Sequence, residues 1–108
     1  MRAYELMVIF ESGLDDQAVD DQVKSVAAQI ATRGGTVAST DRWGRRRFAY
    51  EIDHKTEGYY VVWELTSDGA DLEAVERSLR LADEVVRHKL IRLPEAEAER
   101  RGMAGAAA

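Results

Sequence analysis

The sequence of 108 residues contains no cysteine. Disulfide bonds, thiolate catalysis and cysteine-ligated zinc or iron–sulfur sites are therefore excluded. Long apolar runs are also missing, since the apolar stretch at residues 6–10 is far shorter than the roughly 20 residues that cross a bilayer. The N-terminus shows neither the apolar region nor the small-residue cleavage site of a secretory signal, so we expect a cytoplasmic protein without membrane association.

Groups that could carry catalysis or hold a metal are sparse. The two histidines, His54 and His88, lack neighbouring ligands at the spacing that zinc requires. Paired aspartates at 15–16 and 20–21 fall on an amphipathic segment, where helix capping and solvation account for them. No glycine-rich phosphate loop and no nucleophile motif is recognisable. We therefore predict a protein that is not an enzyme and that uses no cofactor, metal or small-molecule substrate.

What the chain does contain is charge that is segregated along the sequence. Its net charge of −5 argues against nucleic-acid binding by the surface as a whole. Residues 42–47, however, hold four arginines and no acid, and aromatic side chains at Trp43, Phe48 and Tyr50 interleave with them or follow them. Planar guanidinium groups fork onto phosphate oxygens and stack on rings. This patch indicates a docking site for nucleic acid, with an aggregation-resistant strand edge as the alternative interpretation.

Hydropathy patterns predict six elements in the order β-α-β-β-α-β. Apolar and β-forming side chains dominate two segments, which we expect to be the central strands, and two other segments have one apolar helical face. The predicted strands are residues 2–10, 36–52, 59–65 and 85–93, and the predicted helices run from Asp15 to before Gly34 and over about 71–82. Gly44 is expected to form a bulge, and residues 53–58 are expected to form a polar hairpin loop.

This order predicts an α+β protein of the ferredoxin-like class, a four-stranded antiparallel sheet with two helices on one face. The domain comprises residues 1–94, and residues 95–108 have too little bulky apolar surface to join a core, so we expect a flexible C-terminal tail. Both faces of the central strands carry apolar side chains, whereas a solvated antiparallel face normally alternates with polar ones. We therefore expect a second subunit, a protein partner or stacked bases to cover the face away from the helices.

Residues 1–93 resemble the family of ribosomal protein six of the bacterial small subunit. The resemblance rests on four signatures, in order and at family-like spacing: MRAYE at 1–5, WGRRRFAYEI at 43–52, GYYV at 58–61 and LRLADEVVRH at 79–88. It implies a ferredoxin-like fold and a non-enzymatic role on the cytoplasmic ribosome. It further implies binding to the central domain of small-subunit ribosomal RNA together with ribosomal protein eighteen, with which such proteins pair.

The resemblance also implies which residues bind RNA, since the family uses basic and aromatic residues at its N-terminus and in two of its strands. By position they are Arg2, Tyr4, Arg46, Tyr50, Arg80, Arg87 and Arg92, with Arg45 and Arg47 as neighbours whose facing the sequence does not decide. Glu51 stands where the family usually has proline, which places an acid beside Tyr50. Ala82 stands where the family tends to have asparagine, which alters a turn residue and not the function.

Two other hypotheses remain open. A homodimer of ferredoxin-like domains could bind a small ligand between two sheets, which the second apolar face supports and the arginine patch opposes. A protein-interaction module that does not bind RNA is the other hypothesis.

Overall fold

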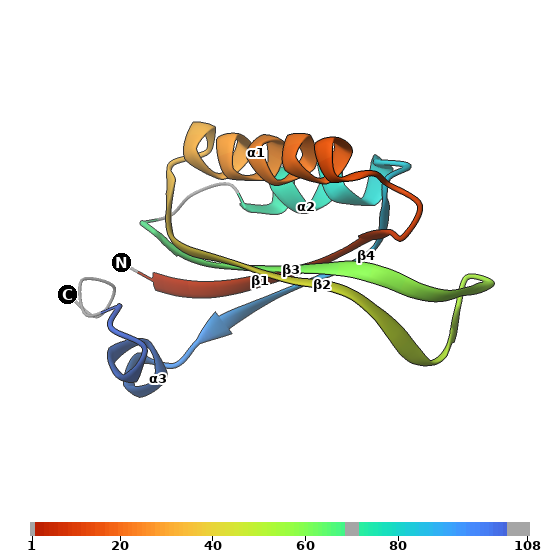
Figure 1. Ribbon diagram of the computed structural model, residues 1–108. Coiled ribbons are helices and arrows are strands. Elements are labelled where there is room, and N and C mark those ends of the chain that lie inside the picture. Colours follow the sequence, from red (N-terminus) through yellow and green to blue (C-terminus); the bar gives the residue numbers. More distant parts are fainter. Residues whose placement is uncertain (1, 69–71, 104–108) are drawn as a thin grey trace.

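The computed structural model describes residues 2–68 and 72–103 (Figure 1). Its elements are β1 (Arg2–Glu11), α1 (Asp16–Thr32), β2 (Gly35–Ile52), β3 (Lys55–Ser67), α2 (Leu72–Leu81), β4 (Val85–Leu93) and α3 (Glu95–Arg100). The first six confirm the predicted β-α-β-β-α-β order, and α3 lies in the segment that we expected to be a flexible tail. No helix within the described ranges is long and apolar enough to span a membrane.

All four strands form one antiparallel sheet in the order β2-β3-β1-β4, so the two most apolar strands lie in the middle, as predicted. β1 pairs with β3 from Arg2 opposite Ser67 to Glu11 opposite Gly58, and it pairs with β4 along its other edge. Helices α1 and α2 cover one face of this sheet (Figure 1). We call the opposite face the open face.

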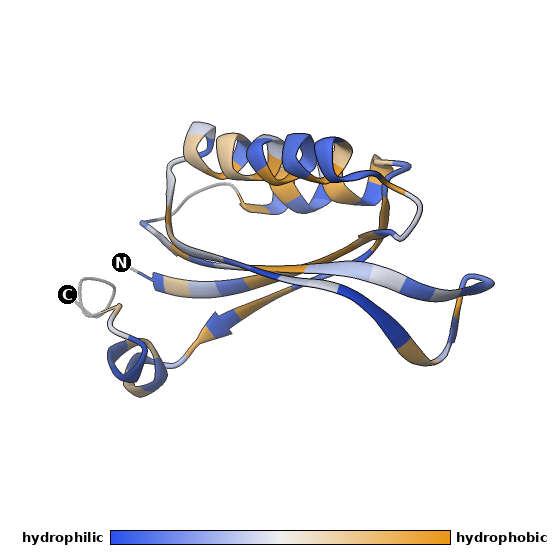
Figure 2. Ribbon diagram, viewed as in Figure 1, coloured by the Kyte–Doolittle hydropathy of each residue, from blue (hydrophilic) through white to orange (hydrophobic). Residues whose placement is uncertain are grey.

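The main core lies between the sheet and the two helices, and Figure 2 shows the apolar sides of the helices turned toward the sheet. Alternate residues of the central strands point into this layer, because successive side chains of a strand face opposite sides. The buried members are Leu6, Val8 and Phe10 of β1, Tyr59, Val61, Trp63 and Leu65 of β3, Val19, Val26 and Ile30 of α1, and Leu72, Val75 and Leu79 of α2. Each large side chain contributes about 1.5–3 kcal/mol when fully buried, so this layer supplies most of the stabilisation.

Helix α1 begins and ends where its sequence predicts. The carboxylate of Asp15 accepts a hydrogen bond from the backbone N–H of Ala18 at 2.8 Å, which satisfies one of the free donors of the first turn. At the other end Gly34 adopts a φ of 90°, a left-handed conformation that suits glycine after a helix. The predicted start of α2 at residue 71 lies outside the described residues.

The hairpin between β2 and β3 is longer and tighter than predicted. We expected a loop over 53–58, but only Asp53 and His54 form the turn, with φ of 50° and 64°, as in the two-residue type I′ hairpin. Residues 55–57 lie beyond the last residue of β3 that pairs with β1, so they have no core to face and are polar. That polarity is what led us to predict a loop. A two-stranded ribbon in solvent needs no apolar face.

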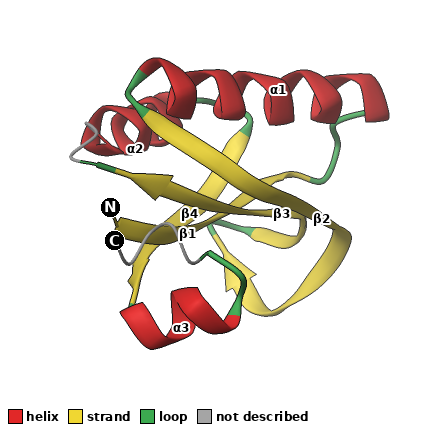
Figure 3. Ribbon diagram, turned by 90° about the vertical axis from the view of Figure 1, so that its left-hand side faces the viewer, coloured by secondary structure: helices red, strands yellow, loops and turns green. Residues whose placement is uncertain are grey.

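Residues 95–103 pack against the open face at one end of the sheet (Figure 3). Ala98 and Met103 are buried together with Ala3 of β1 and Leu93 of β4. We expected residues 95–108 to have too little bulky apolar surface to join the core. Residues 95–103 instead form a separate satellite cluster, which needs only one methionine and small neighbours, and the flexibility of the tail stays a prediction. Residues 104–108 lie outside the described residues, and the domain boundary at residue 94 stays a prediction.

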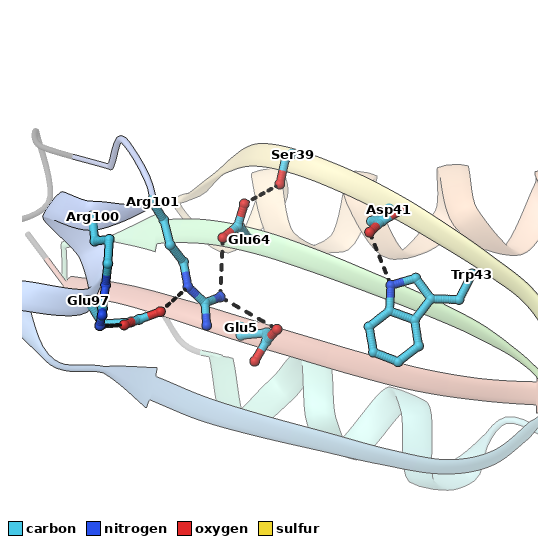
Figure 4. Close-up of polar contacts among 8 residues, drawn as sticks. All are labelled: Glu5, Ser39, Asp41, Trp43, Glu64, Glu97, Arg100 and Arg101. Atoms are coloured by element: carbon cyan, nitrogen blue, oxygen red, sulfur yellow. Dashed lines mark hydrogen bonds and ion pairs between the residues drawn. The ribbon is translucent and has the colours of Figure 1, made fainter.

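Arg101 connects this C-terminal segment to the sheet through ion pairs (Figure 4). Its Nε lies 2.7 Å from Oε1 of Glu97, and its Nη1 lies 3.2 Å from Oε2 of Glu64 and 3.5 Å from Oε1 of Glu5. Glu5 and Glu64 are direct cross-strand partners, so Arg101 neutralises two carboxylates that would otherwise repel each other. The hydrogen bond from Arg101 lowers the pKa of Glu97 below its usual value, and the charge of the neighbouring Arg100 acts in the same direction.

We expect Gly58→Ala to destabilise the protein by about 1–3 kcal/mol. A Cβ at Gly58 would lie 2.4 Å from Cγ2 of Ile9 and 3.1 Å from the carbonyl oxygen of Phe10, so the β1 backbone would have to move. Gly13→Ala is the matched control, because no atom lies within 4 Å of a Cβ there. Urea unfolding midpoints measure the difference, and equal midpoints for the two variants would contradict the close approach at Gly58.

We also expect acid to loosen the docked C-terminal segment. A carboxyl whose folded pKa is depressed stabilises the fold above its unfolded pKa and loses that contribution as pH falls through the folded pKa. The methyl NMR signal of Met103 should therefore move toward the position of an exposed methionine below about pH 4. Glu97→Gln should move the signal in the same direction already at pH 7, and Glu99→Gln should leave it in place. A Glu97→Gln variant with the wild-type signal at pH 7 would contradict this role.

Candidate nucleic-acid interface

A β-bulge at Gly44 decides which way the arginines of β2 point. Arg42 lies opposite Val61 and Gly44 opposite Tyr60, so Trp43 is an extra residue in β2, and Gly44 adopts a φ of 86°. This extra residue interrupts the normal alternation of a strand. The bulge that the sequence predicted at Gly44 is thereby confirmed, and it sorts the arginine patch onto two faces of the sheet.

Arg42 points toward α1. Its Nη1 lies 2.5 Å from Oδ1 of Asp20, and its Nε donates to the hydroxyl of Tyr59 at 3.2 Å. The hydrogen bond to Asp20 raises the pKa of Arg42 above its ordinary value, with a smaller contribution from Tyr59. This guanidinium is therefore already engaged within the protein.

Arg45 points to the same side and is also engaged. Its Nε donates to the carbonyl oxygen of Ser12 at 3.0 Å, and its Nη2 donates to that of Leu14 at 2.5 Å. Both carbonyls belong to the connection between β1 and α1. The guanidinium carbon also lies 5.5 Å from the centre of the Tyr59 ring, which Arg42 approaches at 5.7 Å. The predicted RNA-binding role of Arg45 thus competes with internal hydrogen bonds.

Arg46 lies on the open face, above an aromatic cluster that consists of Trp43, Phe48 and Tyr60. Its guanidinium carbon lies 5.2 Å from the Trp43 ring. Trp43 stacks on Tyr60 with ring centroids 6.0 Å apart and planes 9° apart, and Phe48 meets Tyr60 edge-on at 6.2 Å. The Trp43 indole N–H donates to Oδ2 of Asp41 at 3.1 Å (Figure 4), yet Trp43 remains 42% exposed. A cation and an indole thus lie together, both exposed, on the open face.

Arg47 and Tyr50 are the most accessible of the predicted residues on the hairpin. The side chain of Arg47 is exposed and makes no hydrogen bond or ion pair with any residue of the described ranges, and Tyr50 is 74% exposed. Both are on β2 near the turn, where the ribbon leaves the body of the sheet. They are free to contact a phosphate or a base.

The remaining predicted residues fall at both ends of the sheet. Arg80, at the end of α2, and Arg87, near the start of β4, line one shallow hollow close to where β1 ends. Arg2, Tyr4 and Arg92 lie at the opposite end, where Arg92 is paired with Tyr4 across β1 and β4. Since β1 has 10 residues, the two ends are about 30 Å apart. The structure therefore divides the predicted set into a hairpin-end group (Arg46, Arg47, Tyr50, Arg80 and Arg87) and a strand-end group (Arg2, Tyr4 and Arg92).

The two groups differ in how freely their members can reach a ligand. Tyr4 is half-buried and packs against the main core, whereas Arg2 and Arg92 are exposed. His88 lies beside Arg87 in the chain, and its Nε2 is 3.2 Å from Oε1 of Glu76. No group of three or more potential metal ligands gathers within the described parts of the chain. The accessible chemistry is therefore that of guanidinium groups and aromatic rings.

The open face also holds an apolar hollow beside the aromatic cluster. Met7, Val62 and Ile91 line it together with Trp43, and Ile91 is 38% exposed. The charged side chains of Glu5 and Lys89 flank it. The prediction that both sheet faces are partly apolar is thereby confirmed, and α3 covers only one end of the open face.

Sequence reasoning missed the internal roles of Arg42, Arg45 and Arg101. The partners of Arg42 and Arg45 lie about 20–30 residues away in sequence, so no local pattern reveals them. Arg101 did carry a recognisable signal, because Glu97 precedes it by four positions and such pairs meet on one side of a helix.

The fold defines the class of the protein first. One chain of the structure of a chemotaxis kinase P2 domain in complex with a response regulator, from Thermotoga maritima, superposes with a TM-score of 0.56 at 15% identity, covering 85% of this chain and 98% of that one. At this identity the likeness shows the fold alone. Together with the strand order it places the chain among ferredoxin-like α+β proteins, with an exposed basic and aromatic surface.

Sequence relatives then identify the family. The family described as Ribosomal protein S6 matches residues 3–92. The small ribosomal subunit protein bS6 of Salinispora arenicola is 49% identical over 92 residues, which cover 85% of this chain and 96% of the relative. The crystal structure of 30S ribosomal protein S6 from Thermotoga maritima superposes with a TM-score of 0.85 at 31% identity, covering 94% of this chain and 96% of that one. The chain belongs to the ribosomal protein S6 family.

This membership confirms the resemblance seen in the four sequence signatures. The family consists of structural proteins of the small ribosomal subunit, so the chain is a ribosomal protein and not an enzyme. Its place of action is the ribosome in the bacterial cytoplasm.

Proposed function

We propose that this protein is a structural component of the small ribosomal subunit that binds the central domain of the ribosomal RNA together with ribosomal protein eighteen. One observation carries the proposal. A member of the ribosomal protein S6 family presents Arg46, Arg47 and Tyr50 on an exposed hairpin, where no acid of the described residues pairs with them, although its net charge is −5. The RNA-binding residues we propose are the hairpin-end and strand-end groups. Arg45 is left out of them, because its guanidinium already donates to the carbonyl oxygens of Ser12 and Leu14.

The RNA contacts would be chiefly electrostatic. Guanidinium groups neutralise phosphates and release counterions, so the affinity should fall as salt rises. The hairpin-end and strand-end groups are separated by the length of β1, which is too far for a few neighbouring nucleotides to bridge. Such a spacing fits recognition of a folded RNA shape, which is how double-stranded RNA is generally recognised.

The protein partner would occupy the open face. Its apolar hollow, formed by Met7, Val62 and Ile91 beside Trp43, remains uncovered by α3. Exposed apolar surface rimmed by charged side chains is typical of a protein-interaction site. Ribosomal protein eighteen bound there would lie next to Arg46, so the protein partner and the RNA could reinforce each other's binding.

A homodimer that binds a small ligand between two open faces is less well supported. Two copies packed face to face would bring Glu5, Glu64, Lys89 and Arg101 of each chain into the interface. Burying charges that lack new partners is expensive, because they lose their hydration. A stable homodimer in size-exclusion chromatography with light scattering would favour this alternative.

Arg46→Gln should weaken binding to a central-domain RNA fragment and reduce the slope of log affinity against log salt by roughly one, since one phosphate contact is removed. Lys24→Gln is the matched control, because Lys24 is exposed on α1, which covers the opposite face of the sheet from Arg46. Filter binding or fluorescence anisotropy across a salt series measures the slope. A wild-type slope for Arg46→Gln would exclude Arg46 from phosphate contact.

Ile91→Glu should weaken binding of ribosomal protein eighteen by about 10-fold or more, because a charge would enter a buried apolar contact. Leu81→Glu is the control, since Leu81 is 77% exposed but lies on α2, on the opposite side of the sheet. Calorimetric titration of the two proteins without RNA measures the effect. If Leu81→Glu weakened binding as much as Ile91→Glu, the open face would not be the docking surface.

A further inference from the structure

The outer part of the β2–β3 hairpin has little support of its own. Pairing between β1 and β3 ends where Glu11 meets Gly58, so residues 47–57 pair only with each other. Their register is irregular between Arg47 and Ile52. A two-stranded ribbon is marginally stable by itself in water. The direction in which it carries Arg46, Arg47 and Tyr50 therefore depends on how its base is held.

The base of the ribbon is held on the helix side by Arg42 and Arg45. Arg42 is tied to Asp20 of α1, and Arg45 forks onto the two carbonyl oxygens of Ser12 and Leu14. Arg45 directly precedes Arg46, the first arginine of the patch that lies on the open face. A guanidinium donates in two fixed directions at once, which an ammonium group cannot reproduce in the same geometry.

Two further contacts, a half-exposed ion pair and an edge-on ring contact, hold the ribbon less firmly. Lys55 Nζ lies 3.4 Å from Oε1 of Glu11, a half-exposed ion pair of the kind that contributes little. Phe48 packs edge-on against Tyr60 on the open face. Neither contact fixes the strand at the residue adjacent to Arg46.

We propose that Arg42 and Arg45 are positioning residues for RNA binding, which hold the base of the hairpin so that Arg46, Arg47 and Tyr50 reach the RNA in one orientation. This inference rests on the proposed function for its RNA part. The bulge at Gly44 makes it possible, because it turns Arg42 and Arg45 to the helix side and Arg46 to the open face. A preordered hairpin loses less conformational entropy on binding than a mobile one. The arginine patch is thus divided into a pair that orients and a pair that binds.

The first experiment uses the full-length protein without RNA. Arg45→Gln should accelerate amide hydrogen exchange in residues 46–57 on the order of 10-fold, the change expected when one charge-assisted hydrogen bond is lost. Arg45→Lys should accelerate the exchange as well, since lysine keeps the charge but cannot donate to both carbonyl oxygens in the same geometry. Arg46→Gln and Arg47→Gln should stay within about twofold of wild type. Unchanged exchange in Arg45→Gln would overturn the inference, whatever RNA binding shows.

The second experiment measures the affinity of the same variants for the central-domain RNA fragment across a salt series. Arg45→Gln should lower the affinity and leave the salt slope unchanged, whereas Arg46→Gln should reduce the slope by roughly one. A reduced slope for Arg45→Gln without faster exchange would show that Arg45 contacts phosphate, and the inference would be wrong. If no protein, wild type included, bound RNA, the proposed function would fail, while hydrogen exchange would still decide the positioning role.

A variant in another element protects the test against misfolding of β2. Asp20→Ala removes the partner of Arg42 from α1 and leaves the arginine patch intact. It should accelerate exchange in residues 46–57 and leave the salt slope unchanged. Asp16→Ala, an exposed aspartate of the same helix, is the control. Equal exchange in the two aspartate variants would overturn the role of Arg42.

Discussion

The structure depends on one constraint: a single four-stranded sheet buries one face under two helices and leaves the other to be used. Leu6, Val8 and Phe10 alternate with Met7 and Ile9 along β1, so one strand supplies side chains to both faces. The helix side is closed by the main core, which stabilises the domain. The open face keeps an apolar hollow and an aromatic cluster that α3 does not reach. An isolated protein would gain nothing from that surface, whereas a subunit of a larger assembly would.

The bulge at Gly44 decides how the arginines of β2 are shared between the two faces of the sheet. In a regular strand, residues at odd spacing point to opposite faces, so Arg42 and Arg45 would lie on different faces of the sheet. With the extra residue at Trp43, Arg42 and Arg45 both lie on the helix side. There they contact Tyr59, and they donate hydrogen bonds to Asp20 and to two backbone carbonyls. The same sequence run therefore makes internal contacts with Arg42 and Arg45 and supplies Arg46 and Arg47, which we propose bind RNA. This division reconciles a short basic run with a chain of net negative charge.

The sequence was sufficient to predict the element order, the sheet partners in the middle and the Gly44 bulge, since each has a local signal in hydropathy or glycine placement. It predicted less well where a segment does not face the core. Residues 55–57 are polar because they have no partner in β1, and a polar run of this kind is also typical of loop sequences. Residues 95–103 pack with Ala98 and Met103, too few apolar side chains to stand out in composition. The candidate site was located by its arginines and by family resemblance, but the facing of Arg45 depended on Ser12 and Leu14, some 30 residues away in sequence.

We propose that one small chain binds RNA with its hairpin and a protein with its open face. Hydroxyl-radical footprinting is the most direct test. It would compare the protein alone, with the central-domain RNA fragment, with ribosomal protein eighteen, and with both. We predict that RNA protects Tyr50, that ribosomal protein eighteen protects Trp43 and Ile91, and that the complete assembly protects all of them more strongly while Leu14 stays unchanged. Equal oxidation of Tyr50 and Ile91 in the free protein and in the complete assembly would contradict the account.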